Sequence, residues 1–358
     1  MRGLSLVIHI ACLVACGFPR PADVPGDDDA GRSGLPGAGA CFGNFLKICL
    51  AEAPTMPFTI STAANVNTDS PLCASVVSGG AGYCVIAATD ITINATLRAT
   101  GTRPLVLIAS GSIVTTALID VSSNRTPDRA LGIGAGGDPS VCAPGIRPVG
   151  RGGNAGGSFI GLGGSGGFGS DGSTGGTPGA TMTDVTELRG GCPGQNGFNL
   201  DEGGYGGGAV FLIAGKRIDV QGGINASGAG GFGSSGGANP GYGGGSGGMI
   251  GFEAPMITCS SLLLASGGGG GGGSTGAFEG GNGQDPATTD PALGGLGANG
   301  GTGGNGSMAA RAAPGLAGGP GNPAGEVAGG GGGGGGAGLI KAPASAQLGT
   351  NVSPPPTP

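Results

Sequence analysis

Ile91-Thr92-Ile93-Asn94-Ala95-Thr96-Leu97-Arg98-Ala99 is the first of four copies of a nine-residue unit that recurs without an internal gap. The other copies span residues 113–121, 218–226 and 257–265. Superposing them gives four columns of apolar or small residues, at the first, third, seventh and ninth positions. The first column is isoleucine in every copy, and the seventh is leucine or isoleucine. Internal repetition of this kind is typical of a chain that stacks one structural unit on the next.

The spacing of these columns predicts β-strands. Inward positions two residues apart imply a strand with one buried face, because successive side chains of a strand point to opposite sides. Each copy therefore predicts two short strands that meet at a corner. A further short apolar strand precedes each copy, at residues 84–86, 106–108, 211–213 and 250–252.

The offsets between the copies predict how these strands stack. The first two copies begin at residues 91 and 113, 22 residues apart, and the later offsets fit the same length plus an insertion at one fixed corner. A degraded fifth turn lies at 338–343. We therefore predict an all-β fold: a short right-handed parallel β-helix of about 22 residues per turn and four to five turns.

Three long glycine-rich insertions interrupt the repeat, at about 124–208, 229–248 and 268–336. Glycine supplies 92 of the 358 residues, a composition that usually favours disorder. The alternative is that these segments lie side by side as polyproline-II-like strands, because only glycine lets backbones approach so closely. The sequence leaves both interpretations open.

The N-terminal 15 residues predict a lipoprotein signal peptide. Arg2 is followed by a mostly apolar run over 4–15, which is typical of a secretory leader and too short for a spanning helix. Leu13-Val14-Ala15-Cys16 resembles the bacterial lipobox. That resemblance implies cleavage before Cys16 and acylation of its thiol, so that a lipid anchors the mature protein. The alternative is an ordinary leader that contains a cysteine.

Composition divides the remainder of the chain. Residues 16–40 are rich in Gly, Pro and Asp and predict a flexible tether. Residues 41–84 predict a cap that covers the exposed end of the solenoid. The solenoid and its insertions then span 85–348, and 349–358 predict a Pro-rich tail that cannot pair as a central strand.

The cysteines of the cap predict disulfides formed in an oxidising compartment. Cys41, Cys49, Cys73 and Cys84 allow three connectivities. Our working hypothesis pairs Cys41 with Cys49 and Cys73 with Cys84. Beyond the cap, Cys142 and Cys192 most simply close the first insertion.

The remaining cysteine of the predicted solenoid, Cys259, lies in the inward column held elsewhere by Ile93, Thr115 and Val220. Cysteine at such a position behaves as a small hydrophobic residue. We therefore predict a buried free thiol and no nucleophile there.

Charge excludes some classes of partner. The formal net charge is −6 and only 10% of residues are charged, so the chain lacks the basic footprint of a nucleic-acid-binding protein. The only histidine, His9, lies in the leader, which removes the commonest general base and imidazole metal ligand from the mature chain. We predict no catalytic, cofactor-binding or metal-binding residues.

Two weaker signals point to chemistry. Residues 166–171 and 280–285 match the first half of a calcium-binding nonapeptide, but the matches are isolated, and chance matches are expected in so much glycine. Parallel β-helices can also carry polysaccharide lyases and hydrolases. Glycoside hydrolysis requires a pair of carboxylates, and the outward columns do not stack two acids. Acids in the loops could still converge in the fold, among them Asp138, Glu187, Asp201 and Glu202.

The lipobox, the Cys41-to-Cys49 spacing and the alternation of strands such as 103–109 with Gly-Gly-x-Gly-Gly insertions together resemble a known type of protein. They are similar to the uncharacterised glycine-rich lipoproteins of myxobacteria and related Gram-negative bacteria. The resemblance covers roughly 41–348, rests on composition and rhythm, and brings no catalytic residues. It implies a protein of the bacterial cell envelope, lipid-anchored at the outer membrane.

These observations predict a non-catalytic surface lipoprotein with a structural, spacer or adhesive role. The expected partners are the membrane, through the lipid anchor, and extracellular matrix, polysaccharide or another cell surface. The alternatives are a polysaccharide-active β-helix enzyme, and a protein that binds ice or crystal surfaces through glycine-rich ridges. The latter would need regular Thr-x-Thr rows, and the repeats show none.

Overall fold

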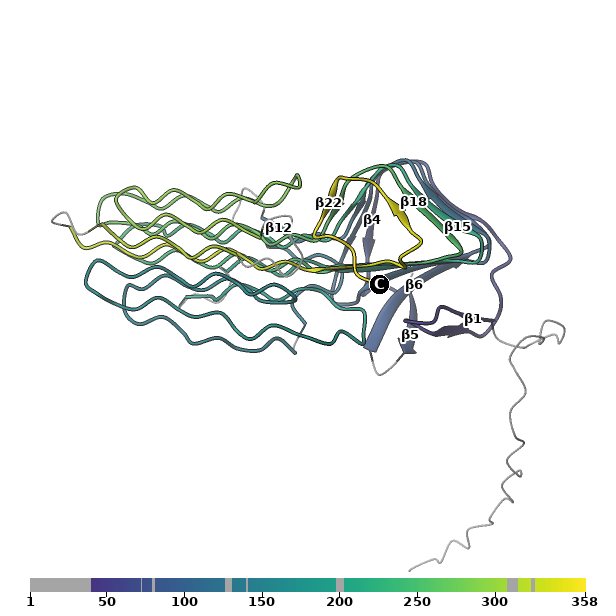
Figure 1. Cartoon of the computed structure of the whole chain (residues 1–358), viewed down its shortest axis with the longest axis horizontal. Coiled ribbons are helices and arrows are strands. Elements are labelled where there is room, and N and C mark those ends of the chain that lie inside the picture. The colour runs from purple at the N-terminus through teal and green to yellow at the C-terminus, as the bar shows by residue number, and fades with distance from the viewer. Residues whose placement is uncertain are drawn as a thin grey trace, which may run out of the picture. The chain divides into compact units, whose positions relative to one another are not determined.

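The computed structural model describes residues 40–71, 73–78, 81–125, 131–139, 141–197, 203–307, 315–322 and 326–358. These described residues contain 22 β-strands and no helix. Within the unit Gly39–Pro358, most strands belong to three six-stranded sheets, here called sheets I, II and III, which the chain enters in turn (Figure 1).

Sheet I is parallel throughout. Along the sheet its strands are β3 (Phe58–Ile60), β7 (Ile91–Ile93), β10 (Ser112–Thr115), β15 (Arg217–Val220), β18 (Met256–Cys259) and β21 (Gln347–Leu348).

Sheet II is also parallel throughout. Its strands, in order, are β4 (Ala64–Asn67), β8 (Leu97–Thr100), β11 (Ile119–Asp120), β16 (Ile224–Asn225), β19 (Leu263–Leu264) and β22 (Val352–Ser353).

Sheet III is parallel except at one edge, where its first two strands form an antiparallel pair. Its strands are β5 (Ala74–Ser78), β6 (Ala81–Ala88), β9 (Leu105–Ala109), β14 (Ala209–Ala214), β17 (Met249–Glu253) and β20 (Leu339–Lys341).

Two antiparallel pairs lie outside these sheets. The first joins β1 (Ala40–Phe42) to β2 (Ile48–Leu50), and the second joins β12 (Asn124–Arg125) to β13 (Leu131–Gly132).

The four copies of the nine-residue unit pair in the register that their columns predict. In sheet I, Ile91 pairs with Ile113, Ile113 with Ile218, and Ile218 with Ile257. In sheet II, the seventh column pairs in the same way, from Leu97 to Leu263. The column assignment is therefore confirmed.

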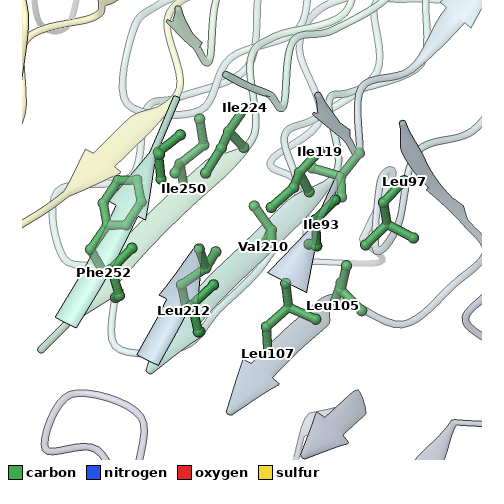
Figure 2. Packing of buried hydrophobic residues seen from close by; sticks show 14 of the residues in the cluster. Ile93, Leu97, Leu105, Leu107, Ile119, Val210, Leu212, Ile224, Ile250 and Phe252 are labelled. Carbon is green, nitrogen blue, oxygen red and sulfur yellow. The ribbon is translucent and has the colours of Figure 1, made fainter. Parts of the chain in front are cut away.

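The three sheets enclose an inner core. Figure 2 shows side chains from all three sheets turned towards one another, among them Ile93 of β7, Leu97 of β8 and Leu105 of β9. All three side chains are fully buried. Strands of sheets I and II alternate buried and partly exposed residues, as in β7 and β8, because only one face of each sheet is covered.

Sheet III differs because both of its faces are buried. Every residue of β9 and β14 is buried, which explains their continuous apolar sequences. Leu107 and Leu212 point into the inner core, whereas Val106 and Phe211 join a second cluster, here called the outer core. Residues of the β1–β2 hairpin and of the first insertion, such as Leu46, Phe159 and Leu188, complete the outer core.

The prediction of a single short right-handed parallel β-helix with four to five turns is wrong. The strands form three separate six-stranded sheets, one with an antiparallel edge pair, and two further antiparallel pairs stand apart from them. A prediction based on the repeated unit did not include the strands that carry no copy of that unit. The segment expected to be a cap supplies β3 and β4, and the expected tail supplies β22 at the edge of sheet II.

The glycine-rich insertions form a body of extended, mutually hydrogen-bonded segments that run side by side (Figure 1). We call it the glycine body. Hydrogen bonds between two segments recur at every third residue, which is the period of a polyproline II helix. For example, Gly241, Gly244 and Gly247 donate to the carbonyls of Gly330, Gly333 and Gly336 over 2.9–3.0 Å. The segments are 151–157, 161–168, 190–194, 203–208, 227–234, 239–248, 266–274, 280–285, 292–297, 299–307, 315–322 and 329–337.

The uninterrupted glycine run at 329–336 lies in the middle of this body. Its amides donate to segments 151–157, 268–274 and 316–319. Its carbonyls accept from segments 241–247, 161–167 and 301–307. Neighbours therefore cover all three sides of a three-fold helix.

This packing explains why the run tolerates no side chain. A Cβ on Gly333 would collide with the carbonyl oxygen of Gly164, and one on Gly334 would collide with that of Asn305. The other glycine run, 267–273, is surrounded in the same way by segments 239–245, 281–284, 301–304 and 329–335, among others. Segments at the periphery keep one open side, where the third residue of each Gly-Gly-x triplet can carry a side chain.

Candidate functional site

The outer surface of the glycine body is the first candidate site. Its open positions carry apolar side chains that remain largely exposed within the described structure: Leu296 is 77% exposed and Phe168 is 57% exposed. Leu293 lies on the same segment as Leu296, and Leu162 on the same segment as Phe168. Such residues on a hydrogen-bonded framework make a stiff surface of low charge.

A groove beside the β1–β2 hairpin is the second candidate site. The cavity measures about 590 Å³, and one wall is the hairpin turn at 42–45. The opposite wall is formed by the ends of β14, β17 and β20 with Pro255 and Pro343. The rings of Phe45 and Phe211 stack in the outer core beside it, with centroids 5.6 Å apart.

The polar groups of this groove are engaged within the protein. The Glu253 carboxylate accepts hydrogen bonds from the Asn44 amide at 2.6 Å, from the Asn44 side chain and from the Phe45 amide at 3.4 Å. Lys341 Nζ lies 4.7 Å from the centroid of the Phe45 ring and donates to the Pro358 carbonyl over 3.0 Å. The surface that the groove leaves open to a ligand is therefore mainly aromatic and proline. Its charged residues, Glu253 and Lys341, contact the hairpin and hold it against sheet III.

The sequence did not single out these residues. Asn44 and Glu253 are separated by 209 residues, and neither lies in the repeated columns. The only signal was the aromatic content of residues 42–45 in the predicted cap, which does not identify a partner.

The structure joins Cys41 to Cys49, Cys73 to Cys84 and Cys142 to Cys192, the pairs of our working hypothesis. Cys259 is a buried free cysteine whose Sγ lies 3.5 Å from the Ser261 carbonyl. Burial raises the pKa of the Cys259 thiol, which keeps it protonated and unreactive. The signal peptide, Cys16 and all of the tether except Ala40, the first residue of β1, lie outside the described residues.

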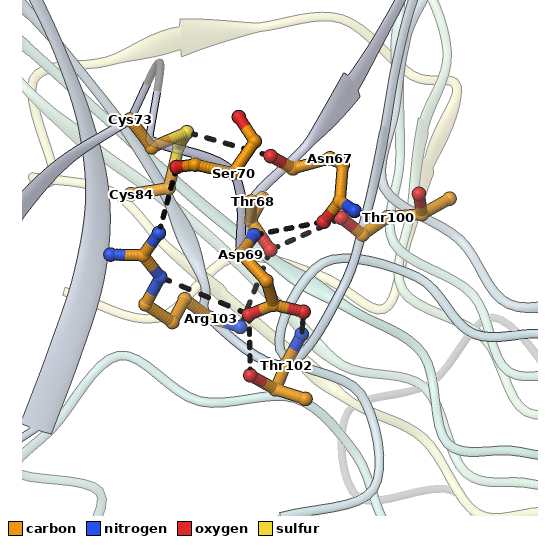
Figure 3. Close-up of a disulfide and its surroundings, with 9 residues drawn as sticks. All are labelled: Asn67, Thr68, Asp69, Ser70, Cys73, Cys84, Thr100, Thr102 and Arg103. Carbon is orange, nitrogen blue, oxygen red and sulfur yellow. Dashed lines mark hydrogen bonds and ion pairs between the residues drawn. A yellow bond between two sulfur atoms is a disulfide. The ribbon is translucent and has the colours of Figure 1, made fainter.

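The Cys73–Cys84 disulfide lies beside a polar network that ties two corners together (Figure 3). Asp69 accepts hydrogen bonds from the Thr102 amide at 2.9 Å and the Thr102 hydroxyl at 2.6 Å. Arg103 donates to the Ser70 carbonyl over 3.3 Å, and its Nε lies 3.9 Å from the Asp69 carboxylate. This guanidinium is therefore engaged with oxygen acceptors.

The loop acids considered for catalysis do not all fall within the described structure. Asp201 and Glu202 lie outside it, and Glu187 is exposed. Asp138 is partly buried and accepts a hydrogen bond from the Gly206 amide at 2.6 Å. Burial raises the pKa of Asp138 to about 7, although the Gly206 hydrogen bond opposes the shift.

The acids of the two calcium-like motifs serve local contacts. Asp171 accepts from the Ser173 amide at 3.0 Å and lies 3.5 Å from Arg151. Asp285 accepts from the Gly230 amide at 2.7 Å and the Arg125 amide at 3.0 Å, so that it joins the third insertion to the other two. Among the described residues, no group of three or more His, Cys, Asp or Glu side chains is arranged to hold a metal ion.

In the outward columns the structure pairs opposite charges. Arg98 and Asp120, neighbours in sheet II, form an ion pair at 2.6 Å. Asp219 of sheet I accepts from the Thr258 hydroxyl at 3.1 Å and lies 3.9 Å from Arg217. These contacts stabilise the ladder rather than assemble a pair of catalytic carboxylates.

No protein-family model, curated protein or solved structure matches this chain. In the part of the chain that the structure describes, there is no helix long and apolar enough to span a bilayer.

Proposed function

We propose that the protein is a lipid-anchored lipoprotein of the bacterial surface that acts as a rigid spacer or adhesin and catalyses no reaction. Its anchor is the acylated Cys16 of the lipobox-like Leu13–Cys16 sequence, and its site is the outer membrane. The mature chain then presents the glycine body to matrix, polysaccharide or another cell surface.

The observation that carries this proposal is the hydrogen bonding of the glycine body. Its segments bond to neighbours at every third residue, so the insertions form a framework rather than a set of loose loops. A hydrogen-bonded backbone favours adhesion because segments that are ordered before binding lose less conformational entropy when a partner binds. Apolar side chains such as Leu293, Leu296 and Phe168 stand exposed on this framework.

The disulfides support an extracytoplasmic site. The described residues contain three disulfides, and such bonds persist in the periplasm or at the cell surface but are rare in the reducing cytosol.

The anchor is tested by expressing the full-length protein in a Gram-negative host with Cys16→Ser. We expect loss of the protein from the membrane fraction, and loss of labelling by a fatty-acid analogue. Cys12→Ser is the matched control, because Cys12 lies in the same leader outside the lipobox-like sequence. Unchanged membrane retention of the Cys16→Ser protein would overturn the anchor.

Adhesion is tested by coupling the full-length protein to beads and measuring their retention under flow on polysaccharide and cell surfaces. We expect retention that changes little with salt, because few charges are presented. The double variant Leu293→Ser, Leu296→Ser should lose most of it. The control is Met56→Ser, Met256→Ser, which removes apolar side chains of similar exposure outside the glycine body.

The enzymatic alternative is tested on the same preparation. Reproducible conversion of pectin-like or other polysaccharides, abolished by substitution of a loop acid, would replace the adhesive role with a catalytic one. Retention unaffected by the Leu293 and Leu296 substitutions would also contradict the proposed surface.

A further inference from the structure

Arg189 is a buried cation that faces sulfur. The residue is only 7% exposed, and it forms none of the ion pairs found between described residues. Its Nε donates to the Gly190 carbonyl over 3.2 Å, and its Nη1 lies 2.7 Å from Met182 Sδ. Its guanidinium also covers the Phe159 ring, with 5.1 Å to the centroid.

The remaining nitrogen of this guanidinium points at a disulfide. Arg189 Nη2 lies 3.3 Å from Cys192 Sγ and 3.5 Å from Cys142 Sγ. Sulfur in a thioether or disulfide is a weak acceptor. A buried guanidinium is normally paired with an anion, because desolvating an unpaired charge is costly. Burial lowers the pKa of Arg189, and the exposed Glu187 only partly opposes this.

The disulfide is also accessible to a small reagent. Cys142 and Cys192 both line a cavity of about 260 Å³ beside Pro144, Ser158 and Gln195. Cys142 is partly exposed, whereas Cys192 is 5% exposed. An incoming thiolate therefore meets Cys142 first, and Cys192 is the sulfur next to the guanidinium.

We propose that Cys142–Cys192 is a redox-sensitive bond that exchanges with dithiols, and that Arg189 stabilises the Cys192 thiolate released when the bond opens. In the first step a thiolate of the dithiol attacks Cys142 Sγ, forms a mixed disulfide and releases Cys192 as a thiolate. In the second step the other thiol of the reagent loses its proton to solvent and attacks its own sulfur in the mixed disulfide, which releases Cys142. The protein disulfide gains two electrons, and the dithiol is oxidised to a disulfide.

Arg189 would favour the reduced state because only reduction gives its guanidinium a negatively charged partner, the Cys192 thiolate. A thiolate 3.3 Å from a buried guanidinium makes a charge-assisted contact, whereas the oxidised sulfurs offer only a weak one. A neighbouring cation lowers the pKa of a thiol and stabilises the reduced form, which makes the disulfide a stronger oxidant.

The other disulfides provide a contrast. Cys84 is fully buried and Cys73 nearly so, both within the inner core, and the nearby Arg103 is turned to Ser70 and Asp69 (Figure 3). Cys41 and Cys49 sit opposite each other in the β1–β2 pair. Among the described residues, no hydrogen bond is found between an arginine and a sulfur of either bond.

Opening the Cys142–Cys192 bond would loosen the part of the first insertion that packs on sheet III. Phe159, Met182 and Leu188 of the first insertion pack in or against the outer core, and the Cys142–Cys192 bond closes the loop that carries them. A segment that responds to thiol reductants is a property separate from anchoring and adhesion.

The test equilibrates the full-length protein in buffers with graded ratios of reduced to oxidised dithiothreitol, traps thiols by alkylation and maps them by peptide mass spectrometry. We expect Cys142–Cys192 to be half-reduced at a more oxidising ratio than Cys73–Cys84. Arg189→Gln should lower its equilibrium constant for reduction about tenfold, the equivalent of one pKa unit. Arg147→Gln is the control, because Arg147 lines the same cavity without a sulfur contact in the structure.

A second readout does not depend on the variant folding. In the reduced wild-type protein, Cys192 should react with iodoacetamide at a lower pH than an unperturbed thiol, whereas Cys259 should not. Reduction of Cys142–Cys192 only at or beyond the ratio that opens Cys73–Cys84, or an ordinary alkylation profile at Cys192, would overturn the proposal.

Discussion

The amide of Gly333 donates to the carbonyl of Asn154 over 2.8 Å, and this contact joins the third insertion to the first. The carbonyl of Gly333 in turn accepts from the Gly244 amide of the second insertion at 2.9 Å. One glycine thus connects all three insertions. The glycine body is a single hydrogen-bonded assembly because the central run at 329–336 has no side chains.

Gly333→Ala should therefore destabilise the glycine body. The added Cβ would collide with the Gly164 carbonyl, and overpacking of this kind costs about 1–3 kcal/mol. Urea denaturation followed by protease sensitivity of the insertions checks this. Gly276→Ala is the matched control, since a Cβ there meets no atom within 4 Å. Equal stability of the two variants would show that the central run is not packed as described.

Ile218→Asp should unfold the three sheets. Ile218 is fully buried in the inner core, and an unpaired carboxylate there is expected to cost about 4 kcal/mol or more. Lys216→Asp introduces the same residue at an exposed position two residues away and should change the melting temperature little. A wild-type melting curve for Ile218→Asp would refute the column assignment.

Asp138 should make stability fall as pH rises. The pKa of Asp138 is about 7 in the folded protein and 3.8 ordinarily. Between pH 3.8 and pH 7 the carboxyl is therefore protonated in the folded state and ionised in the unfolded state. The free energy of unfolding therefore decreases from about pH 4 to pH 7 by this group's contribution.

Asp138→Asn should remove that contribution while its side-chain oxygen can still accept from the Gly206 amide. We expect the variant to exceed the wild type in stability by about 1–2 kcal/mol at pH 8, less than the full linkage value because the carboxyl is partly exposed. The difference should vanish near pH 4. Urea titrations of both proteins at pH 4, 6 and 8 measure it, and a pH-independent difference would refute the assignment.

Glu253→Ala should release the β1–β2 hairpin. It removes the acceptor of the Asn44 and Phe45 amides, a loss of about 1–2 kcal/mol. Trypsin should then cut after Lys47 about tenfold faster, a ratio that corresponds to about 1.4 kcal/mol. The cleavage is followed on reducing gels, because the Cys41–Cys49 disulfide would otherwise hold the two fragments together. Glu52→Ala, an exposed acid in the next loop, is the control, and equal cleavage rates would contradict the fastening role.

Strand pairing within the four copies could be predicted because each column alternates with outward residues, and a shift by one residue would expose the whole apolar set. Ile91, Ile113, Ile218 and Ile257 consequently stack in register. The strands β3, β4 and β22 were missed because they carry no copy of the unit. The antiparallel turn from β5 to β6 was missed because nothing in the repeat anticipates a reversal of direction.

The arrangement of the glycine body could not be predicted for a different reason. A glycine segment has no side chain with which to select its neighbour, so the sequence indicates a close approach without naming the partner. Contacts such as Glu253 with Asn44, and Arg189 with Cys192, depend on segments brought together by the fold. Neither pair shares a motif or a column.

Amide hydrogen exchange across 329–336 is the decisive measurement for the packing of the glycine body. We expect slow exchange throughout this run in the full-length protein, at rates comparable with those of β9 and β14, because every amide from Gly329 to Gly336 donates to a neighbouring segment. Exchange of these glycines at the rate of an unstructured chain, with β9 and β14 still protected, would contradict it and leave three sheets bearing flexible loops.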